Sequence, residues 1–173
     1  MGTVLAEGTS EYVGVRFQKL GKLYHFRVGR HKDIEAGDNV IVDTKRGRQL
    51  GQVIAFIDPD SVLRRRGLRS VERKATPRDL VLQQVWQAKE LDVLISCRER
   101  ATNMGIKDAK FLKAEYSFDG SWLTVLYTSE NKKLDLKSLR SALNRAFRSK
   151  VELRSVGPRD VARIMGGYGA CGA

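Results

Sequence analysis

Hydrophobic and polar positions follow two different patterns along this chain. From Tyr12 to Ile57, apolar residues alternate with polar ones over short runs, and turn residues separate the runs. This alternation predicts β-strands, over residues 12–17, 23–28, 40–43 and 50–57, with a basic hairpin tip at residues 44–48. Four or five strands this short suit a small SH3-like β-barrel over residues 1–60.

After Ala75 the apolar period changes to that of an α-helix. Thr76, Pro77 and Asp79 form a helix start with a capping box, and the pattern continues to about Thr102, before Gly105. The helical stripe consists of Val81, Val85, Ala88, Leu91 and Ile95. Because Leu82, Trp86 and Val93 broaden it, we expect this helix to be buried on more than one side. Cys97 within it is interpreted as a buried small hydrophobe.

The remaining elements complete an α-β-β-α-β domain over residues 76–173. An Asp119-Gly120 hairpin turn joins strands 110–118 and 121–128. Asp135 is expected to cap a helix that runs to Arg148, followed by a strand over 150–156. A short helix is predicted over 159–165, ended by Gly166 and Gly167. The overall prediction is an α+β protein.

The faces of this sheet can also be assigned from the alternation. The buried face is expected to carry Leu112, Ala114, Tyr116, Leu123, Val125 and Tyr127. The opposite face carries Lys113, Trp122, Thr124, Lys150 and Arg154, which combine an aromatic ring with positive charge. Such a face suits stacking of a base or binding of a partner, and core packing is the alternative for Trp122.

Residues 61–75 are predicted to be an arginine-rich linker between the two domains. They carry Arg64, Arg65, Arg66 and Arg69. One interpretation is a solvated charged segment, and the other is an arm that follows phosphates.

Charge strengthens the second interpretation. The chain has 32 Lys and Arg residues against 20 acidic ones, a formal net charge of +12. Such a field attracts polyanions, and nucleic acid is the leading partner class. An acidic protein, a membrane surface, or a role in solubility alone are the alternatives. The candidate nucleic-acid contacts are Arg64, Arg65, Arg66, Arg69, Lys45, Arg46, Arg48, Lys137, Arg140 and Arg148.

Catalytic patterns are missing from the sequence. The only histidines, His25 and His31, belong to no metal-binding or nucleophile arrangement. The sequence therefore predicts a protein that is not an enzyme and takes no small-molecule substrate. There is no apolar run long enough to span a bilayer and no secretory signal, and two cysteines offer no disulfide framework. A reducing cytoplasm is the expected location.

The C-terminal segment carries a family resemblance. Its motif consists of Gly157, Arg159, Asp160, Gly166, Gly167, Gly169, Cys171 and Gly172. Residues 115–119, 127–128 and 133–136 extend the match in the same order, with Lys133 and Leu136 as departures. From about residue 11 onward the chain resembles the polymerase-suppressor C-terminal conserved domain family of bacterial proteins.

The resemblance implies a non-catalytic RNA-associated adaptor that directs ribonuclease Y in mRNA maturation and turnover. It also implies protein partners, with Arg159, Asp160, Gly166, Gly167 and Gly169 as docking residues. Iron–sulfur clusters are implied in the family, and Cys171 is the candidate ligand here. Because a cluster requires about four thiolates and this chain has two cysteines, we expect no cofactor in this chain alone. A cluster would require further ligands from partners or a longer C-terminus. The alternatives are an interaction module without RNA contact and an iron–sulfur or redox sensor.

Overall fold

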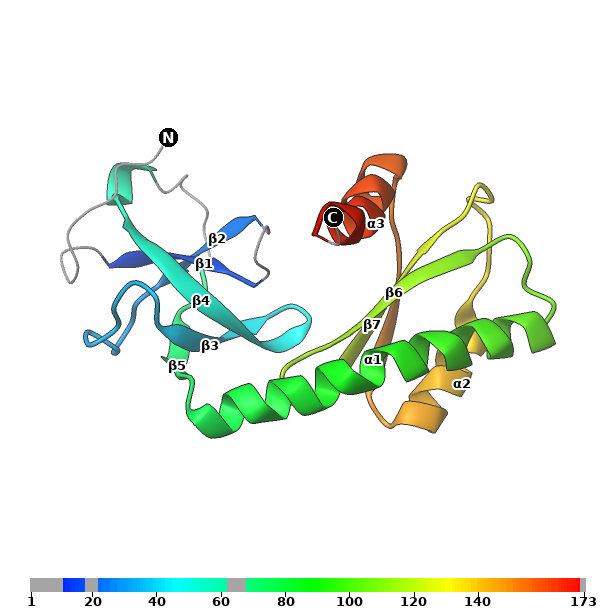
Figure 1. The fold of residues 1–173 in the computed structure, drawn as a ribbon, viewed down its shortest axis with the longest axis horizontal. Coiled ribbons are helices and arrows are strands. Elements are labelled where there is room, and N and C mark those ends of the chain that lie inside the picture. The colour runs from blue at the N-terminus through cyan, green and yellow to red at the C-terminus, as the bar shows by residue number, and fades with distance from the viewer. Residues whose placement is uncertain (1–10, 18–21, 62–67, 172–173) are drawn as a thin grey trace. The chain divides into compact units, whose positions relative to one another are not determined.

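The computed structural model of the chain describes residues 11–17, 22–61 and 68–171, with side chains described through Ile164 (Figure 1). The chain divides into two units, residues 1–83 and 84–173. Each unit contains its own sheet, and the helices lie mainly in the second unit. The predicted α+β class is therefore confirmed.

The first unit is a five-stranded antiparallel sheet with the order β2-β1-β4-β3-β5. Its strands are β1 (Tyr12–Arg16), β2 (Leu23–Arg27), β3 (Asn39–Thr44), β4 (Gly47–Ile57) and β5 (Val71–Lys74), and a short 3-10 helix, η1 (Pro59–Ser61), follows β4. The alternating apolar residues make one core of Val13, Val15, Phe26, Val28, Ile34, Val40, Val42, Val53, Phe56 and Val71. At Gly51, an added Cβ would lie 2.5 Å from Val15 Cγ1, so glycine permits the close approach of β1.

The end of the predicted linker is part of this sheet, which corrects the expectation for residues 61–75. Val71–Lys74 form β5 and pair with β3. The buried Val71 side chain explains the strand, because it completes the core beneath β3. The outer strands β2 and β5 are joined only by an isolated bridge between Arg27 and Ser70 among the described residues. The sheet is thus not a closed barrel, and the SH3-like barrel stays a prediction.

The second unit holds a three-stranded sheet with the order β6-β7-β8. The elements after β5 are α1 (Pro77–Asn103), β6 (Lys110–Tyr116), β7 (Trp122–Thr128), α2 (Lys137–Phe147), β8 (Lys150–Ser155) and α3 (Pro158–Cys171) (Figure 1). β6 and β7 form the predicted hairpin, but β6 ends at Tyr116 and β7 begins at Trp122, so the connection is longer than the predicted Asp119-Gly120 turn. β8 is parallel to β7 through the crossover helix α2. The core consists of Val93, Leu94, Cys97, Ala101, Phe111, Ala114, Leu123, Val125, Leu136, Leu139, Leu143 and Val151.

The predicted capping box of α1 is confirmed. At the start of α1, Thr76 N–H donates to Asp79 Oδ2 at 2.7 Å, and Asp79 N–H donates to Thr76 Oγ1 at 3.3 Å. The Arg73 guanidinium also donates to this carboxylate, with its Nη2 atom 3.0 Å from Asp79 Oδ1. At α2 the N-cap position is Leu136, which makes no side-chain capping hydrogen bond, and Asp135 lies one residue before it. Asp135 still accepts the N–H of Lys137 at 2.9 Å, so it contacts the first turn from outside the N-cap position.

The expectation that α1 is buried on more than one side is wrong. The predicted stripe faces outward: Val81 is 59%, Val85 46%, Leu91 65% and Ile95 44% exposed. The buried face is the opposite one, made by Val93, Leu94, Cys97 and Ala101. Both faces of this helix are apolar, and a three-stranded sheet on one side covers only one of them.

A β-bulge also corrects one face assignment. The β6–β7 register shifts between Phe111 and Lys113, and this moves Leu112 to the outer face. There Leu112 packs with Leu126 and Val156 beneath Val161 and Ile164 of α3. Phe111 takes its place in the main core. The helix α3 therefore covers part of the outer face of the sheet.

The last helix is longer than predicted. It runs from Pro158 to Cys171, so Gly166 and Gly167 do not end it. Glycine weakens a helix interior by about 1 kcal/mol relative to alanine but does not forbid it. The predicted helix end at Gly166 and Gly167 is therefore wrong, because the two glycines are unfavourable in a helix but do not end it.

Candidate nucleic-acid interface

The predicted basic hairpin tip between β3 and β4 is held by turn hydrogen bonds. Thr44 Oγ1 donates to the Gly47 carbonyl at 2.8 Å and accepts the N–H of Arg46 at 3.1 Å. The Gln49 amide donates to the Arg46 carbonyl at 3.1 Å. These contacts leave Lys45 exposed and Arg46 half-buried.

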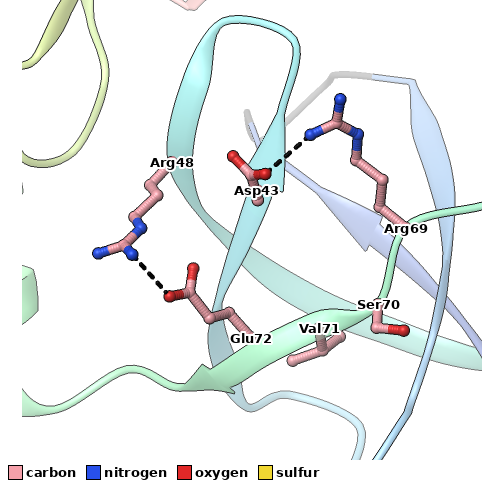
Figure 2. A pocket seen from close by; sticks show the side chains of 6 residues that line it. All are labelled: Asp43, Arg48, Arg69, Ser70, Val71 and Glu72. Atoms are coloured by element: carbon pink, nitrogen blue, oxygen red, sulfur yellow. Dashed lines mark hydrogen bonds and ion pairs between the residues drawn. The ribbon is translucent and has the colours of Figure 1, made fainter.

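Two of the predicted RNA-binding arginines are paired with acids. Arg48 lies 3.0 Å from Glu72, and Arg69 lies 2.8 Å from Asp43. Figure 2 shows both pairs around one shallow hollow, which Ser70 and Val71 also line. Exposed pairs of this kind contribute about 0–1 kcal/mol, so a phosphate can compete for either arginine. The local charge of the four side chains nevertheless sums to zero, which weakens this hollow as a polyanion site.

The remaining arginines predicted for the linker, Arg64, Arg65 and Arg66, lie outside the described residues. Their role in an arm that follows phosphates stays a prediction.

The candidate nucleic-acid contacts on α2 form a basic row that is presented to solvent. Lys137, Arg140 and Arg148 are exposed, and none of them forms an ion pair with an acid in the part of the chain that the structure describes. Arg148 ends the helix in the left-handed conformation, with φ of 53°. Asn144, on the same helix between Arg140 and Arg148, is structural: its Oδ1 accepts the N–H of Val151 at 2.8 Å.

The outer face of the second sheet is mixed in charge. Lys150 Nζ lies 4.5 Å from the centroid of the Trp122 ring, a cation–π contact. Lys113 forms an ion pair with Glu115 at 3.2 Å, while Arg154 is exposed and Thr124 is buried. This face brings the predicted residues together, but the lysines already have partners.

The thiols and histidines do not form a metal site in the described residues. No group of three or more His, Cys, Asp and Glu side chains that could hold a metal ion occurs there. Cys97 is fully buried, and burial raises the pKa of its thiol to about 12, which disfavours a thiolate ligand. The side chain of Cys171 lies outside the description, so the implied cluster has no described ligand set in this chain.

The predicted docking residues lie on α3. Arg159 and Asp160 are exposed in its first turn. Gly166, Gly167 and Gly169 lie within the helix, and Cys171 is its last residue. Their docking role stays a prediction.

Sequence reasoning missed Glu90 and Arg98 on α1. The Glu90 carboxylate accepts the N–H of Tyr116 at 3.2 Å, and Arg98 donates to the Phe111 carbonyl at 2.8 Å. Burial raises the pKa of Glu90 to about 7. A signal was present, because Glu90 is four residues from both Trp86 and Leu94 and therefore lies on the buried face of the helix.

Comparison with known protein families identifies the family of this chain. Residues 69–156, about half of the chain, match the PSP1 C-terminal conserved region. The chain belongs to the PSP1 C-terminal family. The region matched in this PSP1-family chain begins before β5 and ends just after β8, which confirms the resemblance inferred from the C-terminal motif.

One relative of this PSP1-family chain extends the match. The chain is 35% identical over 164 residues to the Stage 0 sporulation protein YaaT of Bacillus subtilis (strain 168), which covers 92% of the chain. The present chain spans 58% of the length of that relative. No solved structure matches the chain. No described helix of this family member is long and apolar enough to span a membrane.

Proposed function

We propose that this protein is a non-catalytic RNA-associated adaptor of the cytoplasm. The observation that carries the proposal is the row of Lys137, Arg140 and Arg148 on α2, whose charges have no acidic partner in the described chain. A net charge of +12 adds a long-range attraction for polyanions. Phosphate contacts of this kind position a nucleic acid without reading its sequence.

Family membership gives the proposal its sharper form. The name of the YaaT relative assigns that protein to sporulation and states no chemistry. The resemblance to the polymerase-suppressor C-terminal conserved domain family, which includes the bacterial regulator RicT, implies action with ribonuclease Y in mRNA maturation and turnover. For this chain, we infer that RNA binds the exposed basic side chains and that α3 contributes to the binding of a protein partner.

The test is fluorescence anisotropy with a labelled single-stranded RNA at several salt concentrations. One variant replaces Lys137, Arg140 and Arg148 with Ala, and another replaces Arg64, Arg65, Arg66 and Arg69. At about 0.7 per phosphate contact on single strands, the log–log salt slope should flatten by about 2 in the first variant and about 3 in the second.

A matched control replaces the exposed Lys32, Lys107 and Lys132 with Ala, which removes the same charge from other places. This control should retain the wild-type slope. Absence of RNA binding at low salt, or equal slopes in all four proteins, would contradict the proposal.

A second candidate function is an interaction module without RNA contact. The acid partners of Arg48 and Arg69 favour it, because they neutralise two of the predicted RNA contacts. A pull-down treated with nuclease separates the two functions, since partners that survive the treatment do not depend on RNA. An iron–sulfur or redox sensor predicts bound iron after anaerobic purification.

A further inference from the structure

The two edge strands of the sheet in the second unit, β6 and β8, differ in the side chains that contact their outward backbone groups. Along β6, α1 supplies a charged side chain to each end of the strand: Glu90 accepts the N–H of Tyr116, and Arg98 donates to the carbonyl of Phe111. These contacts satisfy backbone groups that would otherwise offer a template to another strand. The β6 edge is thereby contacted at both ends, while within the described residues no acceptor contacts the outward N–H of Ala114.

The β8 edge keeps open backbone groups. The N–H groups of Lys150 and Val156 donate toward β7, to Ser121 and Tyr127, so the even-numbered residues face that strand. Backbone groups alternate in direction along a strand, and those of Val151, Leu153 and Ser155 therefore point away from β7.

Only one of these three outward N–H groups has a partner. Asn144 Oδ1 accepts the N–H of Val151 at 2.8 Å. Within the described residues, no acceptor contacts the N–H of Leu153 or of Ser155. The edge thus presents two donors, about 6.6 Å apart at strand spacing, with outward carbonyl groups between them.

Positive charge lies beside these open groups. As the crossover between two parallel strands, α2 runs antiparallel to β8. Asn144 marks where α2 meets the edge, and Arg140 and Arg148 lie one turn away from it on the same helix face. Four helical residues advance about 6 Å, so Arg140 is level with Leu153. Exposed Arg154 adds charge from the outer face of the sheet.

We propose that the β8 edge binds an extended acidic segment of a partner protein as an added strand. An extended peptide supplies donors and acceptors at the spacing of Leu153 and Ser155, and acidic side chains complement Arg140 and Arg154. RNA supplies no such alternating ladder. A second copy of this chain would set Arg140 near its own counterpart, which like charges oppose.

The experiment measures anisotropy of a fluorescein-labelled octapeptide of alternating Glu and Val with the full chain. The key variant is Ser155→Pro, which removes one outward donor and leaves the ladder to β7 intact, because edge strands accept proline at outward positions. Ser155→Ala is the matched control. The same peptide N-methylated at alternate residues, and a Lys–Val peptide of equal length, test backbone pairing and charge.

The proposal predicts that Ser155→Pro and the N-methylated peptide weaken binding at least about tenfold, while Ser155→Ala binds as the wild type does. Arg140→Glu should also weaken binding, and the Lys–Val peptide should not bind. Equal affinity of the Pro and Ala variants would overturn the proposal. So would a wild-type dimer that Ser155→Pro converts to a monomer, because the occupant is then a second copy. RNA binding is measured in a separate experiment. A protein that fails to bind RNA can still bind the acidic peptide, so the two proposals fail independently.

Discussion

Glu90 on α1 accepts the backbone N–H of Tyr116 on β6 at 3.2 Å, from a position where burial raises the pKa of its carboxyl group to about 7. Neighbouring Glu115 raises the pKa further, whereas the Tyr116 N–H and Lys113 lower it. The carboxyl group therefore holds its proton more tightly in the folded protein than in the unfolded chain. Its contribution to stability is complete below about pH 4.5 and declines as the pH rises toward 7.

Glu90→Gln should make the protein more stable at pH 8, by about 1–2 kcal/mol, and flatten the pH dependence between 4.5 and 7. Glutamine retains an acceptor for the Tyr116 N–H and carries no charge to desolvate. Urea unfolding across this pH range measures the effect. The exposed Glu99→Gln on the same helix is the control and should change little. A Glu90→Gln variant that is less stable at pH 8 would contradict this account.

Asp79→Asn should destabilise the first unit by about 2 kcal/mol at pH 7. The Arg73 guanidinium and the Thr76 hydrogen bonds hold the pKa of Asp79 well below its usual range. A lowered pKa means that the stabilisation is present at neutral pH and is lost as the pH falls below about 4. Thermal unfolding at pH 3 and pH 7 should therefore show a smaller acid effect in the variant than in the wild type. Asp92→Asn, at an exposed site on α1, controls for charge removal.

Gly120→Ala should cost more stability than Gly105→Ala. Both glycines have positive φ, +74° and +75°, so both substitutions strain the backbone by about 1 kcal/mol. At Gly105 an added Cβ meets nothing within 4 Å, whereas at Gly120 it overlaps the Trp86 ring. We expect a total of about 2–4 kcal/mol at Gly120. Equal urea midpoints for the two variants would show that Trp86 moves aside without cost.

Cys97 should be unreactive in the native protein. Burial raises the pKa of this thiol to about 12 and leaves it no exposed surface. In a Cys171→Ala variant, an aromatic disulfide reagent at pH 8 should release no colour until denaturant is added, and one equivalent afterwards. Rapid labelling of the native variant would place Cys97 at the surface and contradict the described core.

Local patterns in the sequence determined much of this protein. The alternation between Tyr12 and Ile57, the capping box of Thr76 and Asp79, and the Asp119-Gly120 turn each depend on neighbouring residues, and the structure has each of them. The family was also determined locally, through the motif after Gly157, and the match over residues 69–156 confirms it.

Tertiary structure decided the features that depend on residues distant in the chain. Periodicity shows that both faces of α1 are apolar, but only contact with β6 and β7 selects Leu94 and Cys97 for the core and leaves Leu91 exposed. The bulge that moves Leu112 to the outer face depends on the pairing of β6 with β7. The acid partners of Arg48 and Arg69 likewise come from other strands. Hydrophobic period specifies which residues share a face, while the partner that covers the face is set by packing between segments far apart in sequence.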